Sequence, residues 1–402
     1  MPFFSVLIPT RNRARLLAYA VESVLDQDFT DFEVVINDNA SSDATRETVA
    51  GFSDPRIKYA GSSRFLLTHE NWNACYDRAL GEYLLVLGDD DMLLPGALAQ
   101  TAAVIKERQA QLLSFGVVTY YDSTYFEERL KNTILARDFS GKVIRHDAEK
   151  VISDYLSFRS GLGYPPHPSA MVFRKKTAEG LKAKCGAFYL TPLGEIIAVP
   201  WLIRRTGAMY VIDKPLAVIG RGNTSQVAQE IHDPASMWKN ADTDFRHTPC
   251  KGKYTYNALA ESLLRLQKLE PENFGKYTLP MGEYFLLYYQ DLMEVARAGG
   301  DVNRDLAEFY EKLGELPLQT GRSVRRRLLL LKLKLGLRSL LLKLGLFDAL
   351  RRYIGHAGAK RIKGSDLGIT DIAGCAAKIS AIGAKAGQPL EIWDSRVFPT
   401  NG

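Results

Sequence analysis

The sequence predicts an α/β fold, with a mostly parallel mixed sheet flanked by helices and a helical region at the C-terminal side. Two observations support this prediction. Short apolar runs rich in Val, Ile and Leu alternate with helical periodicity over the first hundred residues, which is typical of βαβ units. From about residue 228 the strand-like runs give way to helical spacing. Ligands of such sheets bind beyond the carboxyl ends of the strands, so the loops there are the first candidates for a site.

The elements of the first half follow in order. Residues 3–9 form the first expected strand, because an apolar, β-branched run stops at a proline. A helix over 16–25 comes next, since its apolar residues recur at three- and four-residue spacing. The same criteria predict strands at 33–36, 56–60 and 83–87, and helices at 43–52, at 69–80 and from residue 94.

Composition narrows the class of protein. Of 402 residues, 46% are hydrophobic and 24% charged, which is typical of a globular protein with room for two domains. The four cysteines are far apart and form no CxxC pair, so neither a zinc site nor a disulfide framework is expected. No signal peptide and no apolar run of the ~20 residues needed for a membrane span is present, so we expect a cytoplasmic protein.

Three polar loops directly follow three of the expected strands. They comprise residues 10–13, 37–42 and 88–91. Because the carboxyl ends of parallel strands meet at one edge of a sheet, we expect these loops to converge on one cleft.

The third loop carries three consecutive carboxylates, Asp89, Asp90 and Asp91, behind Gly88. Adjacent negative charges repel each other, by about 1 kcal/mol or more per close pair, so a cation would stabilise them. Mg²⁺ or Mn²⁺ takes one or two carboxylates and completes its shell with water and phosphate oxygens. The loop therefore predicts a metal-bridged diphosphate, the alternative being a solvated turn that caps the next helix.

The other two loops suit a nucleotide. The carboxylate of Asp38 can accept hydrogen bonds from a base or from ribose hydroxyls, although an Asx turn would also explain it. Arg11, Arg13 and Arg15 flank the first loop and are candidates to meet phosphate charge, whereas each is also compatible with a solvated surface arginine.

Three segments together resemble family 2 glycosyltransferases, in matching order and spacing: residues 6–12, 36–45 and 79–91. The resemblance covers about residues 3–100. It implies a GT-A fold, Mg²⁺ or Mn²⁺, and inverting transfer from a nucleoside-diphosphate sugar, with a UDP-sugar as the expected donor. The acceptor implied is a saccharide or a lipid-linked molecule, as in bacterial surface polysaccharide synthesis.

The resemblance also implies roles for single residues. Pro9, Thr10 and Asn12 would border the nucleoside and Asp38 would contact its base. Arg11 and Arg15 stay phosphate candidates on their charge and position alone. The acidic loop would serve as the DxD motif, but Gly88 stands where many members have the first Asp. That departure makes Asp90 the preferred metal ligand, with Asp91 beside it and Asp89 toward the donor, while an alternative register pairs Asp89 with Asp91.

An inverting transfer needs a general base near the acceptor hydroxyl. The resemblance assigns this role to Glu195, which lies at the expected distance beyond the acidic loop. A structural role is the alternative, since a carboxylate in the first turn of a helix is stabilised by the helix dipole. His167 is a further candidate contact in a Pro-rich loop.

A strongly basic segment lies near the C-terminus. Residues 320–363 contain thirteen Lys or Arg and one acid, Asp348, among many leucines. This composition predicts interfacial helices that bind anionic lipid through residues 322–352. The resemblance to family 2 glycosyltransferases implies that this surface is the inner face of a bacterial plasma membrane. The leucines argue against nucleic acid as the partner. A helix packed on the rest of the protein with its lysines snorkelling is the alternative.

These patterns divide the chain into five expected regions. They are a nucleotide-sugar-binding half (1–110), an acceptor-binding half (111–227), a helical region (228–320), basic membrane-surface helices (321–363) and an unassigned tail (364–402). Two other functions remain open. A sugar nucleotidyltransferase would need a glycine-rich triphosphate loop, which residues 9–12 do not supply, and a non-catalytic membrane-associated sugar-nucleotide binder would leave its donor intact.

Overall fold

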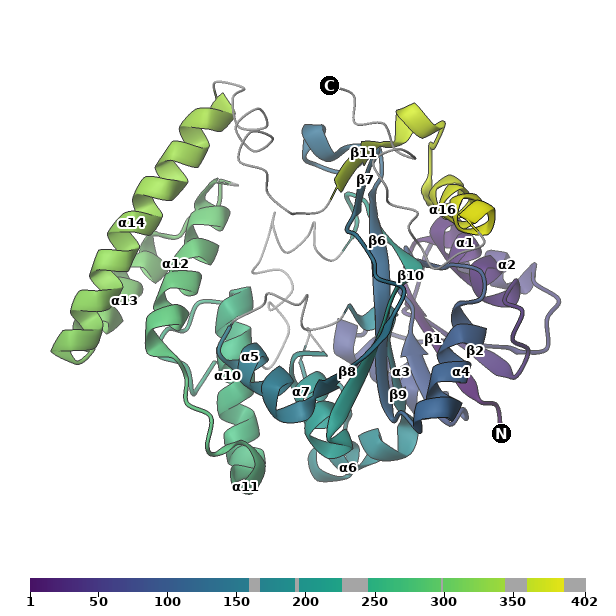
Figure 1. Cartoon of the computed structure of the whole chain (residues 1–402), viewed down its shortest axis with the longest axis horizontal. Helices are drawn as coiled ribbons and strands as arrows, with labels where there is room; N and C mark the ends of the chain where they lie inside the picture. The colour runs from purple at the N-terminus through teal and green to yellow at the C-terminus, as the bar shows by residue number, and fades with distance from the viewer. Residues whose placement is uncertain (159–166, 192–194, 226–244, 298, 344–359, 387–402) are drawn as a thin grey trace. The chain divides into compact units, whose positions relative to one another are not determined.

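The computed structural model describes residues 1–158, 167–191, 195–225, 245–297, 299–343 and 360–386 (Figure 1). The chain divides into two compact units. Unit 1 comprises Met1–Tyr155, Ser160–Gln229 and Lys360–Gly402, and unit 2 comprises Leu156–Arg159 and Glu230–Ala359. In the sequence, unit 2 is thus an insertion in unit 1.

Unit 1 is built on one mixed sheet. Its N-terminal strands pair in parallel in the order β3-β2-β1-β4 and have the bounds β1 Phe4–Thr10, β2 Phe32–Asp38, β3 Ile57–Gly61 and β4 Tyr83–Val86. Each of these four strands begins within one residue of the position that the sequence predicted. The apolar, β-branched runs therefore became strands, as predicted.

The rest of the sheet continues beyond β4 in the order β9-β6-β7-β11 with antiparallel pairing. A further strand, β10, runs parallel to β6 and antiparallel to β5 and β8. The bounds are β5 Met92–Leu93, β6 Leu112–Tyr121, β7 Thr133–Ala136, β8 Val143–Asp147, β9 Met171–Arg174 and β10 Ala208–Arg221. The predicted α/β class is confirmed, but parallel pairing prevails only in the N-terminal part. The link between β6 and β7 is too short for a crossover helix, so these strands pair antiparallel.

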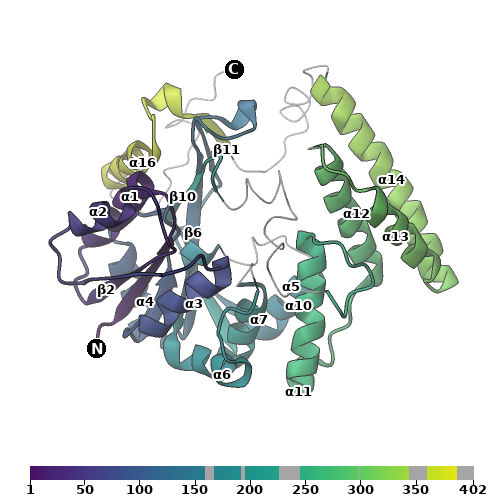
Figure 2. The same ribbon diagram turned by 180° about the vertical axis from the view of Figure 1, so that it is seen from behind.

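Helices cover both faces of the sheet (Figures 1 and 2). One face carries α1 Ala14–Leu25, α2 Thr45–Ala50 and α4 Ala97–Arg108; the other carries α3 Thr68–Arg78, α6 Lys175–Cys185 and α7 Glu195–Thr206. Helix α5 spans Ala148–Leu156. Leu17 and Val21 of α1 pack on Val6 and Ile8 of β1 in the main core. This burial of the apolar stripe of α1 fixes the loop that joins it to β1.

The C-terminal segment returns to unit 1. Strand β11 (Lys360–Lys363) pairs with β7, and α16 (Ile372–Ala386) lies beside α1 (Figure 1). Apolar residues of this segment share a buried cluster with β6 and β10: Ile369, Ile372, Cys375, Ala376 and Ile379. The prediction of helix over 321–363 is therefore wrong at its C-terminal end, where residues 360–363 form a strand and Ile362 packs on the sheet. Residues 364–386, which the sequence left unassigned, belong to unit 1.

Unit 2 is helical in its described part, as expected for 228–320. It contains α10 Thr255–Leu269, α11 Pro271–Phe274, α12 Met281–Arg297, α13 Asn303–Gly314 and α14 Leu318–Lys343. Its aromatic core is centred on Tyr284, Phe285, Tyr288 and Phe309. Within the described ranges, no helix has the length and apolar character that crossing a bilayer would require. Residues 344–352 of the expected membrane segment lie outside the described residues.

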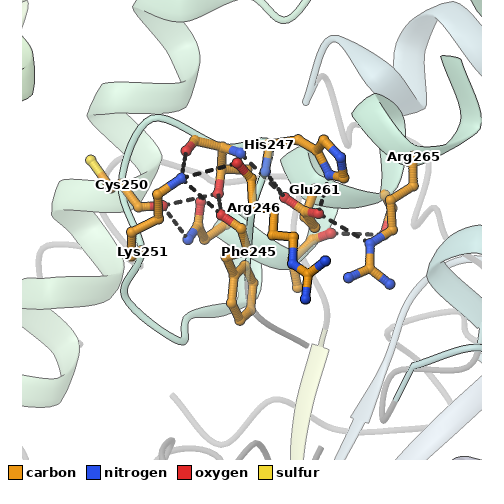
Figure 3. A network of polar contacts seen from close by, with 11 residues as sticks. Phe245, Arg246, His247, Cys250, Lys251, Glu261 and Arg265 are labelled. Atoms are coloured by element: carbon orange, nitrogen blue, oxygen red, sulfur yellow. Dashed lines mark hydrogen bonds and ion pairs between the residues drawn. The ribbon is translucent and has the colours of Figure 1, made fainter. Parts of the chain in front are cut away.

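A buried carboxylate ties α10 to the loop before it (Figure 3). Glu261 accepts hydrogen bonds from the backbone N–H groups of His247 (3.0 Å) and Thr248 (3.2 Å) and from Nε of Arg265 (3.1 Å), and it contacts Nδ1 of His247 at 2.6 Å. Burial alone would raise the pKa of Glu261, but the hydrogen bonds from His247 and Arg265 outweigh it and lower this pKa. The ionised form is thus the one that holds the loop.

Candidate functional site

The three polar loops lie together, as expected from parallel strands. Strand β1 pairs with β2 on one side and β4 on the other, so their carboxyl ends share one edge. Thr10 donates a hydrogen bond from Oγ1 to Oδ2 of Asp89 (2.8 Å). Oδ1 of Asn12 accepts from the backbone N–H of Ser42 (2.7 Å). Side chains of the first loop therefore hold the other two loops in place.

The turn into α1 depends on the same contacts. Asn12 adopts a left-handed conformation, with φ of 52°, which Asn tolerates better than most residues. Asp43 then accepts from the backbone N–H of Ala14 at the start of α1 (3.0 Å) and from that of Thr45 at the start of α2 (3.1 Å). Burial opposes ionisation of Asp43, yet the hydrogen bonds from Thr45 and Ala14 lower its pKa.

The three carboxylates of the acidic loop point in different directions. Asp89 faces β1, where it accepts from Thr10 and forms an ion pair with Nη1 of Arg13 at 2.7 Å. Asp90 lies 3.2 Å from the same Nη1, and its side chain keeps 16% of its surface exposed. Of the three, Asp90 is the one with the most exposed side chain.

Asp91 turns inward. It accepts hydrogen bonds from the Ser169 hydroxyl and from the backbone N–H of Gly220 (2.9 Å), and its side chain is almost fully buried. A Cβ atom at residue 88 would lie 2.7 Å from Oδ2 of Asp91. A larger residue at position 88 would therefore require the side chain of Asp91 to move.

The loop carries more negative charge than its surroundings offset. Burial, together with Asp89, raises the pKa of Asp90, although Arg13 opposes the shift. Burial and Asp90 raise the pKa of Asp91 to about 7. Burial disfavours the charge of Arg13, but Asp89 and Asp90 outweigh it and raise its pKa. A cation beside Asp90 would therefore be stabilised electrostatically.

The donor atoms fit a divalent cation of the Mg²⁺ or Mn²⁺ type. Carboxylate oxygens are the hard ligands such ions prefer, and one or two of them suffice when phosphates and water complete the shell. In the part of the chain that the structure describes, no three His, Cys, Asp or Glu side chains gather into a metal site. The fit is thus to an ion shared with a phosphate ligand rather than to an all-protein cage.

Asp38 is also committed to internal contacts. Its Oδ1 accepts from the backbone N–H of Ser41 (2.9 Å), and its Oδ2 accepts from the hydroxyl of Tyr59 (2.7 Å). Burial and the neighbouring Asp38 raise the pKa of Tyr59 to about 12. Both carboxylate oxygens of Asp38 are therefore engaged within the protein, and a contact to a base stays a prediction.

The three arginines of the first loop separate. Arg13 contacts the acidic loop. The guanidinium carbon of Arg11 lies 4.3 Å from the ring centroid of Phe65. The side chain of Arg15 is 76% exposed, and its Nη2 lies 3.4 Å from Oδ2 of Asp371. Phe65 is itself 48% exposed and follows β3 at the same edge of the sheet. Sequence reasoning did not single out Phe65, and only its position after a strand end could have indicated it.

The other predicted residues are less closely joined. Pro9 lies opposite Asn37 in the ladder of β1 and β2. Glu195 is the first residue of α7, and its side chain lies outside the described part. His167 reaches the acidic loop, with Nδ1 3.9 Å from Oδ2 of Asp91, and burial lowers its pKa to about 3. Ser169, which carries the contact to Asp91, had no signal in the sequence.

Comparisons with known proteins agree with this geometry. Residues 5–165 match the model of the family described as Glycosyl transferase family 2. A GalNAc(5)-diNAcBac-PP-undecaprenol beta-1,3-glucosyltransferase of Campylobacter jejuni is 35% identical over 159 residues, 39% of this chain and 48% of the relative. A PGL/p-HBAD biosynthesis glycosyltransferase of Mycobacterium bovis is 34% identical over 125 residues, 29% of this chain and 47% of the relative. The chain thus spans about half the length of these relatives.

Solved structures show only a distant likeness. The crystal structure of S. aureus TarS 1-349 in complex with UDP-GlcNAc has a TM-score of 0.42 and 18% identity, over 73% of this chain and 82% of that one.

Proposed function

Because residues 5–165 match the model of the family described as Glycosyl transferase family 2, we propose that this protein is an inverting, metal-dependent glycosyltransferase of the hexosyltransferase type. Its donor is a nucleoside-diphosphate sugar, with a UDP-sugar as the first candidate. One observation carries the proposal. The loops after β1, β2 and β4 are joined by hydrogen bonds beside Asp90, a partly exposed carboxylate whose local charge is only partly offset.

Each loop contributes a distinct part of the donor site. Asp38 and Tyr59 form a polar end suited to a base or ribose, with Pro9, Thr10 and Asn12 bordering the nucleoside. Arg11 and Phe65 add a flat cationic and aromatic surface next to it. In the proposed complex, these side chains contact the bound nucleoside.

The acidic loop would hold the diphosphate end. Asp90, with Asp91 or Asp89 as its neighbour, would bind the divalent ion, which when bound offsets negative charge on the leaving diphosphate. Arg13 offsets part of the charge of Asp89 and Asp90 and carries a permanent positive charge next to this position. Arg15, being highly exposed and near Asp371, is the least supported of the phosphate contacts.

The transfer itself needs a base on the acceptor side. We assign this role to Glu195, at the start of α7, which would take the proton of the acceptor hydroxyl as that oxygen attacks the anomeric carbon. The acceptor is a saccharide or a lipid-linked molecule in bacterial surface polysaccharide synthesis, at the inner face of the plasma membrane. The name of the Campylobacter jejuni relative, which includes PP-undecaprenol, supports a lipid-linked acceptor.

The proposal is tested by calorimetric titration of UDP-sugars and other nucleotide sugars, with and without Mn²⁺. We expect binding that requires the metal and that Asp90→Asn weakens at least tenfold, whereas Asp77→Asn, an exposed carboxylate on α3, leaves it unchanged. Two results would contradict the proposal: donor binding that is equally tight with and without metal, or donor binding that is equally tight in Asp90→Asn and Asp77→Asn. Donor that stays intact with a broad acceptor panel would favour a non-catalytic binder.

A further inference from the structure

Helix α14 has two apolar faces (Figures 1 and 2 show it beside α12). One set of residues recurs at three- and four-residue spacing and packs in the core of unit 2: Val324, Leu328, Leu331 and Leu335. A second set recurs in the same way along the helix: Leu329, Leu330, Leu333, Leu337 and Leu340. At 3.6 residues per turn the two sets lie about half a turn apart. We call the second set the leucine face.

The leucine face is exposed. Its five leucine residues keep between 53% and 62% of their surface accessible. Single exposed leucines are common, but five on one side of a single helix form a contiguous apolar patch, which marks an interaction surface. The packing of unit 2 is provided by the opposite side of α14 and does not explain it.

Cations surround the leucine face. Helical spacing puts Arg322 and Arg326 on the same side near its N-terminal end, with Arg325 and Lys334 along its edges. Two other cations are engaged elsewhere, because Arg327 pairs with Glu283 (2.8 Å) and Lys332 donates to Tyr310 (2.8 Å). The four first-named cations have no ion pair with any described residue, and residues 318–343 contain no acid.

We propose that the leucine face of α14 docks on a membrane surface that contains anionic phospholipid. The leucines would enter the boundary between headgroups and acyl chains, while Arg322, Arg325, Arg326 and Lys334 meet the headgroup charge. The helix would lie along the surface without crossing it. This inference stands apart from the transfer reaction, since no residue of the donor site takes part in it.

Two other occupants fit less well. A second copy of α14 would bring cationic helices together with no acid on either to offset them, so the charge opposes self-association. Nucleic acid would meet the cations but leave the leucines exposed. An anionic lipid surface offsets the charge and buries the leucines at once.

The experiment is co-sedimentation of the full chain with phosphatidylcholine vesicles, with or without 30% phosphatidylglycerol. We expect binding to the mixed vesicles and at least tenfold weaker binding to phosphatidylcholine alone. Leu333→Gln with Leu337→Gln should weaken binding at least tenfold. Leu80→Gln, which is 61% exposed on unit 1, should leave it unchanged. Arg325→Ser with Arg326→Ser should weaken it about 25-fold, at about fivefold per cation.

The results can be told apart from misfolding and from loss of the transferase function. Circular dichroism and donor titration should be unchanged in the leucine variant, because its side chains are exposed and lie outside the donor loops. Equal binding by wild type and leucine variant would overturn the inference. The inference would also be overturned if the wild-type protein did not bind vesicles and instead formed a dimer that the leucine changes abolish. The same holds if it bound a single-stranded oligonucleotide and the leucine changes abolished that binding.

Discussion

Arg13 offsets part of the charge of two carboxylates that the fold brings close together. Its Nη1 lies within 3.2 Å of both Asp89 and Asp90, and all three side chains are largely buried. Removing one partner of such a pair leaves a buried charge without compensation, which is more costly than losing an exposed pair.

Arg13→Met should therefore destabilise unit 1 by on the order of 2 kcal/mol, because it keeps the size of the side chain but removes its charge. Mn²⁺ should restore part of the loss, since a cation can take the place of the guanidinium. Thermal unfolding with and without Mn²⁺ measures both effects. Arg15→Met, at an exposed position, is the control and should change little; an equal loss in both variants would contradict this account.

Gly220 lies against the backbone of the acidic loop. A Cβ atom there would overlap the carbonyl oxygen of Asp90 and reach Ile372. Gly220→Ala should cost about 1–3 kcal/mol and weaken donor binding, because the loop must shift. Gly314→Ala at the end of α13, where a Cβ atom meets nothing within 4 Å, should be near neutral. Chemical unfolding compares the two, and similar losses would be evidence against the close approach.

Sequence alone could place Thr10, Asp38 and Asp89 at one edge, because parallel pairing follows from local patterns and brings strand ends together. It could not find Ser169, because the contact of this residue with Asp91, 78 residues away in the sequence, depends on β9 lying antiparallel to β4. It also could not choose among Arg11, Arg13 and Arg15, since their directions depend on the turn at Asn12.

Helix α16 fills a place on unit 1 beside α1 and β10. Ile372 is buried with Val118 and Val218, so truncating it would leave a cavity in this cluster. Ile372→Ala should destabilise unit 1 by about 2–4 kcal/mol. Ile144→Ala on β8, a partly exposed position, should cost much less. Urea unfolding tests this pair of variants, and a neutral Ile372→Ala would show that the segment is dispensable.

The link from α10 to its preceding loop should depend on pH. The pKa of Glu261 is lower folded than unfolded, so its contribution is present above the unfolded pKa and is lost as pH falls through the folded pKa. Between pH 6 and pH 3, approximately, wild type should thus lose more stability than Glu261→Gln, which should itself be about 1–3 kcal/mol less stable at neutral pH. Urea midpoints across this range measure the difference. Parallel curves for the two proteins would contradict the role of the carboxylate.

At the scale of the whole molecule, two separate cores stand out. Unit 1 has the clusters around its sheet, and unit 2 has the aromatic cluster of α12 and α13. Sequence composition indicated a helical second part. It placed the end of the basic helical segment at residue 363, after β11, because a strand of four residues has no distinct sequence pattern.

Calorimetry should therefore show two unfolding transitions, of which a nucleotide sugar with Mn²⁺ raises only one, because ligand stabilises the unit that binds it. Phe309→Ala, in the core of unit 2, should lower the other transition. The account would be contradicted if the protein unfolded in a single transition that moved both with ligand and with Phe309→Ala.

The pairing of β11 with β7 has a consequence for the order in which the protein is made. Synthesis proceeds from the N-terminus, so the ribosome releases all of unit 2 before residues 360–363 emerge. Until then β7 lacks its outer neighbour, and a bare strand edge is a template for wrong pairing with other chains. The sheet of unit 1 is therefore completed by β11 only after the whole helical unit has been synthesised.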